Sequence, residues 1–552
     1  MIIFIVIAVV FHLLLSADFV SWDDWQTIAQ NPRLNPVTWE EVGYYWAHSY
    51  MDLYVPVTYM FWGFLAAIGR TGAADPNGIW LNPAVFHGAN LLLHVGSSVI
   101  VYKILRMLAA LPATALFGAL LFAIHPVQVE AVGWISGGKD VLAGLLSLAC
   151  VWQYLEWSEK GWKWHYAFAL GLYAIGMLAK PAAVVTPLVI AGIEIWARGK
   201  SWRKVTRGLW FWIVIAVPVV VVARLAQPTP ETFVTPLLGR PVVMMDALAM
   251  YMGKLIWPAQ LGIDYGRAPE WVLGSTDKYF TCAATAMVVA IAWAMRKRWR
   301  EIVAGALVFV IMLLPVLGLV KFDFQRYSTV ADHYLYAAML GPAMAGAFAL
   351  ERIKSRWMLC VAGLVITALG IKAFVQTENW RDSRTLFSHA LEVNPTSLAG
   401  NDGLGNMALH TGDIPEAIAR FEEAVRGHPH DPIANFNLAN ALLLAGRYSE
   451  AAASYRWALE GRQYPFLYVN YANALARSGR LKEAFQVAEE GLRQWPESSE
   501  LHATLGALEE SRGNWTEAEE EYADALRNQP SLEAARTGID RVRRAATKSA
   551  AH

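Results

Sequence analysis

Long apolar segments fill the first part of this 552-residue sequence and then stop. Apolar runs with few charges recur from Met1 to about Phe374, whereas charged residues and alanine dominate after Asn379. Because a membrane-crossing helix needs about 20 mostly apolar residues, this pattern indicates a polytopic membrane protein. Only 17% of the residues are charged, against roughly 25% in soluble proteins, which excludes a chain that is soluble or disordered throughout. We therefore expect a membrane domain at 1–378 and a second domain at 379–552.

About eleven apolar runs are candidates for spanning helices, because a helix satisfies its own backbone hydrogen bonds in lipid. A further run, Val242–Trp257, is weaker and could instead lie on the membrane surface as an amphipathic helix. Met1–Ala17 lacks the basic start of a signal peptide and is expected to remain as the first span. The candidates are Ile2–Ser16, Val85–Tyr102, Ala109–Ile124, Val141–Leu155, His165–Ala179, Ala182–Trp196, Leu209–Arg224, Phe280–Met295, Ile302–Val320, Leu335–Leu350 and Met358–Phe374.

Basic residues follow every second predicted span. Lys and Arg cluster at 103–106, 160–163, 198–207, 296–300 and 352–356, and short basic loops of this kind face the cytoplasm. The arrangement predicts a cytoplasmic N-terminus, and an odd number of spans then puts the C-terminal domain outside the cytoplasm. The net charge of zero gives no general attraction to nucleic acid, so we expect no nucleic-acid partner.

The C-terminal domain repeats with a period near 34 residues. Glycines recur at intervals of 34, 33 and 34 residues, at Gly412, Gly446, Gly479 and Gly513. This period is typical of tetratricopeptide repeats, in which helix pairs stack into a solenoid with a concave face suited to a peptide or partner protein. Leu386–Asn394 is expected to form the second helix of a preceding half-repeat. We expect full repeats at about 397–430, 431–464, 465–497 and 498–531, followed by a polar capping helix.

Ionisable residues gather in the loops that are predicted to lie on the outer side, including a long first loop at 18–84. Charged groups at membrane depth are costly, so such residues are functional candidates. Acids could take a proton from a hydroxyl or bind a divalent cation, and cations could hold a phosphate. This combination suits transfer from a lipid-linked phosphate donor. The acids are Asp23, Asp24, Glu130 and Asp140, and the cations are Lys139, Lys180, Lys321, Arg326 and His333.

Several candidates also have simpler structural explanations. Asp140 could cap the helix that follows it, and Lys180 could extend its ammonium group to the membrane interface. His87, Asn90 and His94 share one helix face and could bind a metal, although hydrogen bonding between membrane helices is the more common use of such residues.

An ordered set of short motifs resembles the transmembrane and tetratricopeptide-repeat O-mannosyltransferases and their bacterial relatives, which are membrane glycosyltransferases of the GT-C fold. The resemblance covers nearly the whole chain and implies an all-α, GT-C-like helix bundle followed by the repeat solenoid. It is carried by Trp22-Asp23-Asp24, Val55-Pro56-Val57-Thr58, the run Phe86–His94, His125-Pro126 with Glu130-Ala131-Val132, Gly138-Lys139-Asp140-Val141-Leu142, Ala179-Lys180-Pro181 and the run Ala331–Tyr336.

The resemblance implies an inverting glycosyltransferase of a bacterial inner membrane. It would move a sugar from a polyprenyl-phosphate-linked donor to a Ser or Thr hydroxyl of an extracytoplasmic protein, which the repeats would bind. The resemblance places the base at Asp23. This sequence differs from the family pattern at Lys139, Pro181 and His333, where relatives often have Arg, Glu and Arg. The implied catalytic residues are Asp23, Asp24 and Glu130, the donor-phosphate ligands are Lys139, Lys180, Arg326 and His333, and the supporting residues are His125, Asp140, Asp332 and Tyr336.

Two other functions stay open at the level of sequence. The acceptor could be a lipid or polysaccharide rather than a protein, or the membrane part could be a non-catalytic anchor for the repeat scaffold. The repeats favour a protein acceptor because they usually bind peptides. The sugar is not specified by the sequence, and a divalent cation remains one option for the acids.

Overall fold

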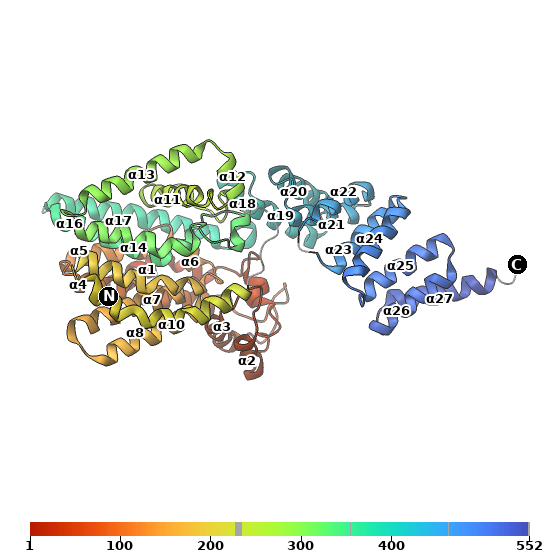
Figure 1. The fold of residues 1–552 in the computed structure, drawn as a ribbon, viewed down its shortest axis with the longest axis horizontal. Coiled ribbons are helices and arrows are strands. Elements are labelled where there is room, and N and C mark those ends of the chain that lie inside the picture. Colours follow the sequence, from red (N-terminus) through yellow and green to blue (C-terminus); the bar gives the residue numbers. More distant parts are fainter. Residues whose placement is uncertain (227–234, 354, 462, 550–552) are drawn as a thin grey trace. The chain divides into compact units, whose positions relative to one another are not determined.

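The computed structural model describes residues 1–226, 235–353, 355–461 and 463–549, and the chain folds into two compact units (Figure 1). Unit 1 comprises the described residues up to Pro395, and unit 2 begins at Thr396. Both units are built from helices, and the described ranges contain isolated β-bridges but no β-strand. The all-α fold predicted from the sequence is therefore confirmed.

Each of the apolar runs predicted from the sequence is mostly helical in unit 1, although Ile302–Val320 leaves helical structure after Val316. The α-helices are α1 (Ile2–Phe11), α2 (Trp39–Ala47), α3 (Pro56–Gly69), α4 (Pro83–Met107), α5 (Pro112–Ile124), α6 (Gln128–Gly133), α7 (Gly138–Lys160), α8 (Lys163–Ala179), α9 (Thr186–Gly192), α10 (Trp202–Ala226), α11 (Arg240–Ile256), α12 (Pro269–Gly274), α13 (Asp277–Met295), α14 (Arg300–Leu313), α15 (Leu335–Ala338), α16 (Leu340–Ile353), α17 (Arg356–Thr377) and α18 (Ser383–Val393). Short 3-10 and π segments lie between them, at η1 (His12–Ser16), η2 (Trp25–Ala29), η3 (Pro181–Val185), η4 (Ile193–Ala197), η5 (Leu314–Val316), η6 (Asp323–Arg326), η7 (Asp332–Tyr334) and η8 (Glu378–Trp380).

Four helical segments among the described residues are long and apolar enough to cross a membrane. They are Pro83–Met107, Trp202–Ala226, Asp277–Met295 and Trp357–Trp380. Other apolar helices, such as Pro112–Ile124, are shorter. The long helices leave large apolar side chains exposed, including Ile213 and Phe280, as expected for surfaces that face lipid rather than water. Unit 1 is thus a membrane unit, and the predicted number of about eleven spans remains a prediction.

Close helix crossings hold the membrane unit together at glycine positions. A Cβ atom added to Gly118 of α5 would lie 2.6 Å from the carbonyl oxygen of Ala343 in α16. A Cβ atom added to Gly305 of α14 would lie 2.6 Å from the carbonyl oxygen of Gly341, also in α16. Small residues let helix backbones approach closely, which is how helices associate where no hydrophobic effect drives them together.

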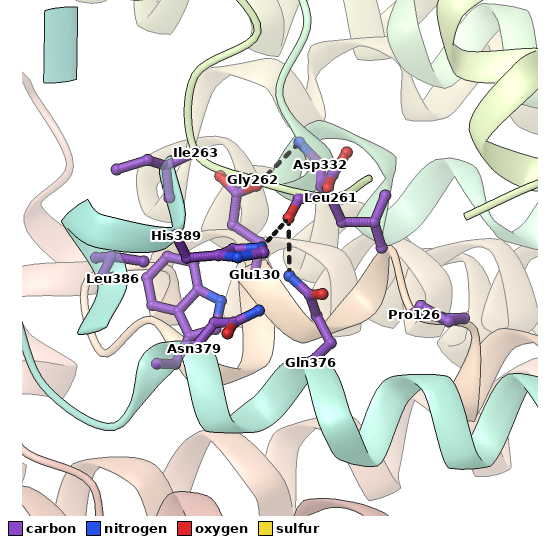
Figure 2. Close-up of a pocket in the computed structure, with 11 residues that line it drawn as sticks. Pro126, Glu130, Leu261, Gly262, Ile263, Asp332, Gln376, Asn379, Leu386 and His389 are labelled. Carbon is purple, nitrogen blue, oxygen red and sulfur yellow. Dashed lines mark hydrogen bonds between the residues drawn. The ribbon is translucent and has the colours of Figure 1, made fainter. Parts of the chain in front are cut away.

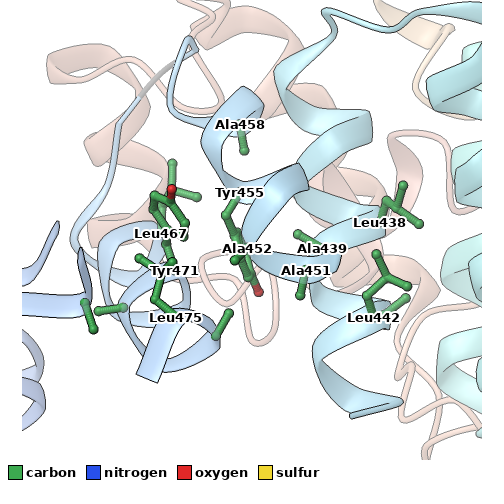
Figure 3. Packing of buried hydrophobic residues seen from close by; sticks show 14 of the residues in the cluster. Leu438, Ala439, Leu442, Ala451, Ala452, Tyr455, Ala458, Leu467, Tyr471 and Leu475 are labelled. Carbon is green, nitrogen blue, oxygen red and sulfur yellow. The ribbon is translucent and has the colours of Figure 1, made fainter. Parts of the chain in front are cut away.

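Unit 2 is a stack of helix pairs that agrees with the predicted repeats. The pairs are α19 (Leu398–Thr411) with α20 (Ile414–Gly427), α21 (Pro432–Leu444) with α22 (Tyr448–Ala458), α23 (Pro465–Arg477) with α24 (Leu481–Gln494) and α25 (Ser499–Arg512) with α26 (Trp515–Asn528), followed by α27 (Glu533–Ser549). A continuous core of alanine, leucine and aromatic side chains joins neighbouring pairs (Figure 3). The recurring glycines end the first helix of each pair with φ between 75° and 83°, a left-handed conformation that glycine adopts without steric cost.

The helix α18 lies in unit 1, so the structure divides the chain later than the sequence pattern suggests. Its Ser383 hydroxyl accepts a hydrogen bond from the backbone N–H of Ser21 at 2.8 Å, and the Phe387 ring lies edge-on to Trp22. His389 contacts the carbonyl oxygen of Leu261 at 2.9 Å. These contacts tie α18 to the segment after η1 and to the segment after α11, although its sequence is amphipathic like that of a repeat helix.

Candidate functional site

The two neighbouring carboxylates after the first helix have different environments. Asp24 is fully buried, and both of its oxygens are used: Oδ2 accepts from the N–H of Val20 at 3.1 Å and Oδ1 from the N–H of Ser136 at 2.7 Å. Burial raises the pKa of Asp24 to about 7, against the effect of these hydrogen bonds. Asp24 therefore ties the loop after η1 to the segment between α6 and α7.

Asp23 instead presents its carboxylate at an accessible surface. Its side chain is 42% exposed, and Oδ2 lies 3.8 Å from the Nζ of Lys139. Desolvation by the surrounding protein raises the pKa of Asp23, and the charges of Lys139 and His333 oppose that rise. This desolvation is incomplete, because part of the side chain remains exposed to solvent. The adjacent Thr27 hydroxyl donates to the Asp23 carbonyl oxygen at 2.7 Å and so fixes the backbone here.

Two lysines lie close to these acids. The side chain of Lys139 is 11% exposed, and its ammonium group sits 4.6 Å from the centre of the Trp134 ring. Lys180, at the end of α8, forms an ion pair with Asp140 at the start of α7 and lies 5.3 Å from the centre of the Tyr334 ring. The second carboxylate oxygen of Asp140 is buried and has no hydrogen-bond partner among the described residues. Both cations are therefore held at helix ends, Lys139 in the first turn of α7 and Lys180 after the last turn of α8, beside aromatic rings.

Glu130 and His333 form a buried pair behind this surface. Glu130 Oε1 lies 2.5 Å from His333 Nδ1, and Oε2 accepts the backbone N–H of Asp332 at 3.1 Å. Burial raises the pKa of Glu130, while the nearby His333 lowers it. The His333 ring also packs edge-on against Trp134 and Phe324, at centroid distances of 5.5 and 5.6 Å. The imidazole is thereby fixed in one orientation.

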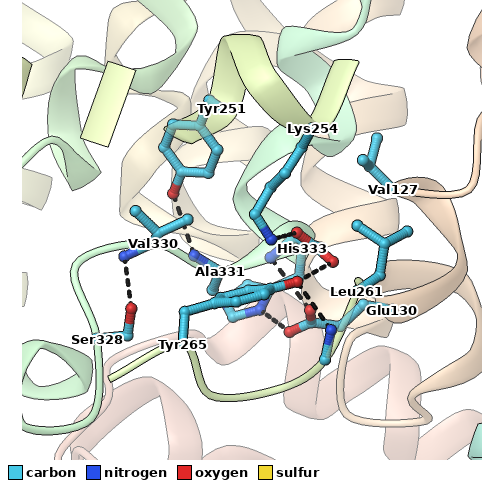
Figure 4. A network of polar contacts seen from close by, with 12 residues as sticks. Val127, Glu130, Tyr251, Lys254, Leu261, Tyr265, Ser328, Val330, Ala331 and His333 are labelled. Atoms are coloured by element: carbon cyan, nitrogen blue, oxygen red, sulfur yellow. Dashed lines mark hydrogen bonds and ion pairs between the residues drawn. The ribbon is translucent and has the colours of Figure 1, made fainter. Parts of the chain in front are cut away.

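A second buried ion pair extends this network, and sequence reasoning missed it (Figure 4). Lys254 of α11 donates to Asp332 Oδ1 at 2.8 Å, and Tyr265 donates its hydroxyl to Asp332 Oδ2 at 2.7 Å. The Lys254 ammonium group also lies 3.0 Å from the centre of the Tyr265 ring. One sequence feature could have identified Lys254: it is one of only two charged residues, with Asp246, in the apolar run Val242–Trp257, where a charge is costly unless paired.

The remaining candidates lie around this centre. His125 Nε2 is 3.2 Å from the carbonyl oxygen of Leu255, and the Tyr336 hydroxyl is 3.0 Å from His94 Nδ1 inside the helix bundle. Both side chains are buried, which suits a supporting role. Arg326 ends η6 and lies beside Tyr327, whose ring contacts Trp22 at a centroid distance of 5.1 Å. Lys321 lies just before η6.

The polar helix face of α4 is used for hydrogen bonding between helices. Asn90 donates to the carbonyl oxygen of Trp134 at 3.2 Å, and His94 bridges Tyr336 and the carbonyl oxygen of Ala123. The described part of the chain contains no group of three or more His, Cys, Asp or Glu side chains arranged to hold a metal ion. The contacts of Asn90 and His94 match the simpler of the two sequence interpretations, whereas the buried ring nitrogens of His87 have no hydrogen-bond partner among the described residues.

A small pocket is lined by Glu130 and Asp332 together with residues of α17, η8 and α18 (Figure 2). Its cavity volume is about 10 Å³, which is room for about one water molecule. The carbonyl oxygen of Leu261 lies at its wall and accepts a hydrogen bond from Gln376 Nε2 at 3.0 Å. The pocket is too small for a sugar.

The predicted residues thus form one constellation of acids and cations. Asp23, Lys139, Asp140, Lys180, Glu130 and His333 are coupled by direct contacts or by mutual electrostatic influence, although they come from distant parts of the sequence. Chemically, an accessible carboxylate with a raised pKa can accept a proton, and lysines beside it can bind a phosphate.

Comparisons with known proteins agree with both parts of the chain. Two tetratricopeptide-repeat family models match residues 403–468 and 465–508. Among solved structures, a crystal structure of YrrB, described as a TPR protein with an unusual peptide-binding site, is 18% identical with a TM-score of 0.25, and covers 28% of this chain and 81% of that chain. A crystal structure of MamA is 17% identical with a TM-score of 0.26, and covers 27% of this chain and 87% of that chain.

Curated relatives match over more of the sequence. Human protein O-mannosyl-transferase TMTC3 is 23% identical over 514 residues, which is 81% of this chain and 55% of that protein. Human protein O-mannosyl-transferase TMTC1 is 23% identical over 427 residues, which is 65% of this chain and 47% of that protein. Drosophila melanogaster Tmtc2 is 35% identical over 126 residues, covering 22% of this chain and 13% of that protein. The chain spans about half the length of the first two relatives. It is therefore a homologue of the TMTC protein O-mannosyl-transferases that carries tetratricopeptide repeats.

Proposed function

We propose that this protein is an inverting membrane glycosyltransferase of the GT-C type. It transfers a sugar from a polyprenyl-phosphate-linked donor to a Ser or Thr hydroxyl of an extracytoplasmic protein. The names of the relatives make mannose the first sugar to test. In this proposal the outer ends of the membrane helices carry the chemistry, and unit 2 binds the acceptor protein.

The accessibility of Asp23 is the observation that carries the proposal. Its side chain is 42% exposed, whereas those of Asp140, Glu130 and Asp332 are 8%, 6% and 3% exposed, and Asp24 is completely buried. A general base must come within hydrogen-bond reach of the hydroxyl that it deprotonates. Asp23 can meet this requirement without rearrangement of the site, and the other four carboxylates cannot.

The reaction follows from this placement. Asp23 takes the proton of the acceptor hydroxyl as its oxygen attacks the anomeric carbon from the face opposite the phosphate. The bond between that carbon and the phosphate oxygen breaks, and the lipid phosphate leaves with the bonding electrons. A single attack from the opposite face inverts the configuration at the anomeric carbon. Lipid phosphate is a stable anion, so cations suffice to stabilise its departure.

The donor phosphate is held by the cations near Asp23. Lys139 and Lys180 are its nearest candidates, and His333, held in place by its contact with Glu130, is a third. Arg326 completes the set from η6. Asp24 keeps the loop in place through its two hydrogen bonds, and Glu130 orients His333, so both act by positioning other groups.

Single-turnover transfer with purified variants tests the proposal. The assay uses the full chain in detergent, a polyprenyl-phosphate mannose donor and a Ser/Thr-containing acceptor protein. Asp23→Asn keeps the size of the side chain but removes its basicity, and should lower the rate roughly 10²–10⁴-fold while donor binding survives. Asp52→Asn is the matched control, because Asp52 is exposed in the same loop and Asn tolerates its left-handed φ of 58°.

Three outcomes would contradict parts of the proposal. A wild-type rate for Asp23→Asn together with an inactive Glu130→Gln would move the base to Glu130. Transfer to lipid or polysaccharide without transfer to any protein would favour a different acceptor class. A wild-type protein that neither transfers sugar nor hydrolyses any polyprenyl-phosphate sugar would favour a membrane anchor for the repeats.

A further inference from the structure

The backbone around Asp23 is held on both sides of this residue. On the C-terminal side, Asp24 is fixed by its two hydrogen bonds to backbone N–H groups. On the N-terminal side, the N–H of Ser21 donates to a side chain of α18, and the Trp22 ring packs among aromatic rings from two elements. The place of the proposed base therefore depends on what holds Ser21 and Trp22.

The helix α18 supplies two of these contacts. Its Ser383 hydroxyl accepts the N–H of Ser21 at 2.8 Å, and its Phe387 ring lies edge-on to Trp22 at a centroid distance of 6.4 Å. Ser383 and Phe387 are four residues apart, so they share one helix face, and both are buried. This face of α18 is thus turned towards the two residues that precede the base.

The segment η6 holds another edge of the Trp22 ring. The Trp22 centroid lies 6.4 Å from that of Phe324 and 5.1 Å from that of Tyr327, which directly follows η6. Trp22 is therefore held between α18 and η6. Because η6 also carries Arg326, the base and one of the proposed phosphate ligands share the same support.

The helix α18 also contacts the other half of the site. His389 Nε2 lies 2.9 Å from the carbonyl oxygen of Leu261, and His389 lines the small pocket together with Asp332 (Figure 2). Tyr265, four residues after Leu261, donates its hydroxyl to Asp332, the neighbour of His333. One helix thus touches the segment of the base and the segment that supports the buried acid network.

The side chain of Asp23 needs this support because its own contacts are weak. It is 42% exposed, and its ion pair with Lys139 spans 3.8 Å. A base must lie within hydrogen-bond reach of the hydroxyl that it deprotonates, and a displacement of about 1 Å can lower a rate roughly 10²-fold. The backbone on both sides must therefore fix the carboxylate.

We propose that Ser383 and Phe387 are positioning residues for Asp23. Together they hold Ser21 and Trp22 so that the carboxylate stays within reach of the acceptor hydroxyl. The inference deepens the proposed function, on which it rests, because it names residues that act through the base rather than on a substrate. The helix α18 then serves the chemistry of unit 1, although its sequence suits a repeat helix.

Single-turnover transfer by the full chain in detergent, with donor binding measured separately, tests this inference. Ser383→Ala removes the acceptor of the Ser21 N–H and should lower the transfer rate roughly 10–100-fold. Donor affinity should stay unchanged, because other residues hold the phosphate. Phe387→Leu keeps an apolar side chain but removes the ring, and should also lower the rate.

Two further substitutions serve as controls. Ser383→Thr keeps a hydroxyl that can accept the N–H of Ser21, and should restore most of the rate. Ser388→Ala is the matched control, because Ser388 is exposed on the same helix and loses the same hydroxyl. It should transfer sugar like the wild type.

A second background separates positioning from a general effect on the fold. Asp23→Asn has no base to misplace, so adding Ser383→Ala should change its remaining rate by less than about 2-fold. A merely structural contribution would lower the rate by the same factor in both backgrounds. Hydrogen–deuterium exchange gives a measurement independent of activity. Exchange at residues 18–24 should be faster in Ser383→Ala, where the Ser21 N–H loses its partner, and unchanged in Ser388→Ala.

Three results would overturn the inference: unchanged exchange in Ser383→Ala, wild-type transfer by both α18 variants, or equal fractional losses in the two backgrounds. Each would leave the proposed function standing. A wild-type rate for Asp23→Asn, or a wild-type protein without transferase activity, would instead contradict the proposed function and remove the inference with it. The two failures are distinct, because the first is seen with the base intact and the second with α18 intact.

Discussion

The pairing of Lys139 with Asp23 makes a quantitative prediction about the pH dependence of transfer. Lys139 lies 3.8 Å from the carboxylate and stabilises its ionised form, and so opposes the burial that raises its pKa. Lys139→Met removes this charge at nearly constant length. The pKa of Asp23 should then rise further. A base acts only when it is deprotonated, so the low-pH limb of the rate profile should move to higher pH.

The distance sets the size of the shift. Two unit charges at this separation interact by about 1 kcal/mol in a water-like dielectric. A water-like value is appropriate because 42% of the Asp23 side chain is exposed, and exposed pairs are worth roughly 0.2–1 kcal/mol. Since one pKa unit corresponds to about 1.4 kcal/mol, the limb should move by roughly 0.1–0.8 unit.

The measurement is kcat/KM for transfer between about pH 4 and pH 8, because kcat/KM reports the ionisation of the free enzyme. Lys139→Arg keeps the charge and should leave the limb within about 0.3 unit of the wild type. Lys139→Met should also lower donor affinity, which changes the height of the profile rather than its midpoint. A limb that stays in place in Lys139→Met, or moves to lower pH, would refute the assignment of Asp23 as the titrating base.

Two further predictions concern the buried network and the topology. Lys254→Met leaves the Asp332 carboxylate buried without its cation, so we expect a loss of roughly 3–5 kcal/mol in the free energy of unfolding, measured by thermal unfolding in detergent. Lys254→Arg should retain most of the stability. An unchanged unfolding temperature in Lys254→Met would show that the fold does not need the ion pair. Unit 2 is predicted to lie outside the cytoplasm, so alkaline phosphatase fused after Arg544 should be active in cells. Strong fluorescence from green fluorescent protein fused at the same position would instead place unit 2 in the cytoplasm and contradict the predicted topology.

Local sequence patterns were sufficient to predict the helices and the repeats. Apolar runs near Pro83–Met107 and Trp202–Ala226 are helical because lipid offers the backbone no hydrogen-bond partner other than itself. The glycines from Gly412 to Gly513 recur because each ends a first helix in a left-handed conformation. Both patterns act within a few turns of helix, so the sequence displays them directly.

The candidate site was only partly visible in the sequence. The motifs singled out Asp23, Lys139 and Lys180, which the structure brings together, and the resemblance placed the base at Asp23, but no pattern in the sequence showed that Asp24 is buried while Asp23 is accessible. That distinction depends on the N–H of Ser136, a residue more than one hundred positions away in the chain. The role of Lys254 was missed for the same reason, because its partner Asp332 lies on a different element.

The sequence by itself determined that this chain has a helical membrane unit and a repeat solenoid, because hydrophobicity and period are properties of short segments. Only the tertiary structure decided which ionisable groups are buried, which are accessible and which pair with each other. Those properties depend on contacts between residues far apart in the sequence. The assignment of α18 shows the same limit: its amphipathic pattern suits a repeat helix, yet its contacts with Ser21, Trp22 and Leu261 join it to the membrane unit. An amphipathic sequence specifies that one face of the helix will be buried. The rest of the fold decides which element that face packs against.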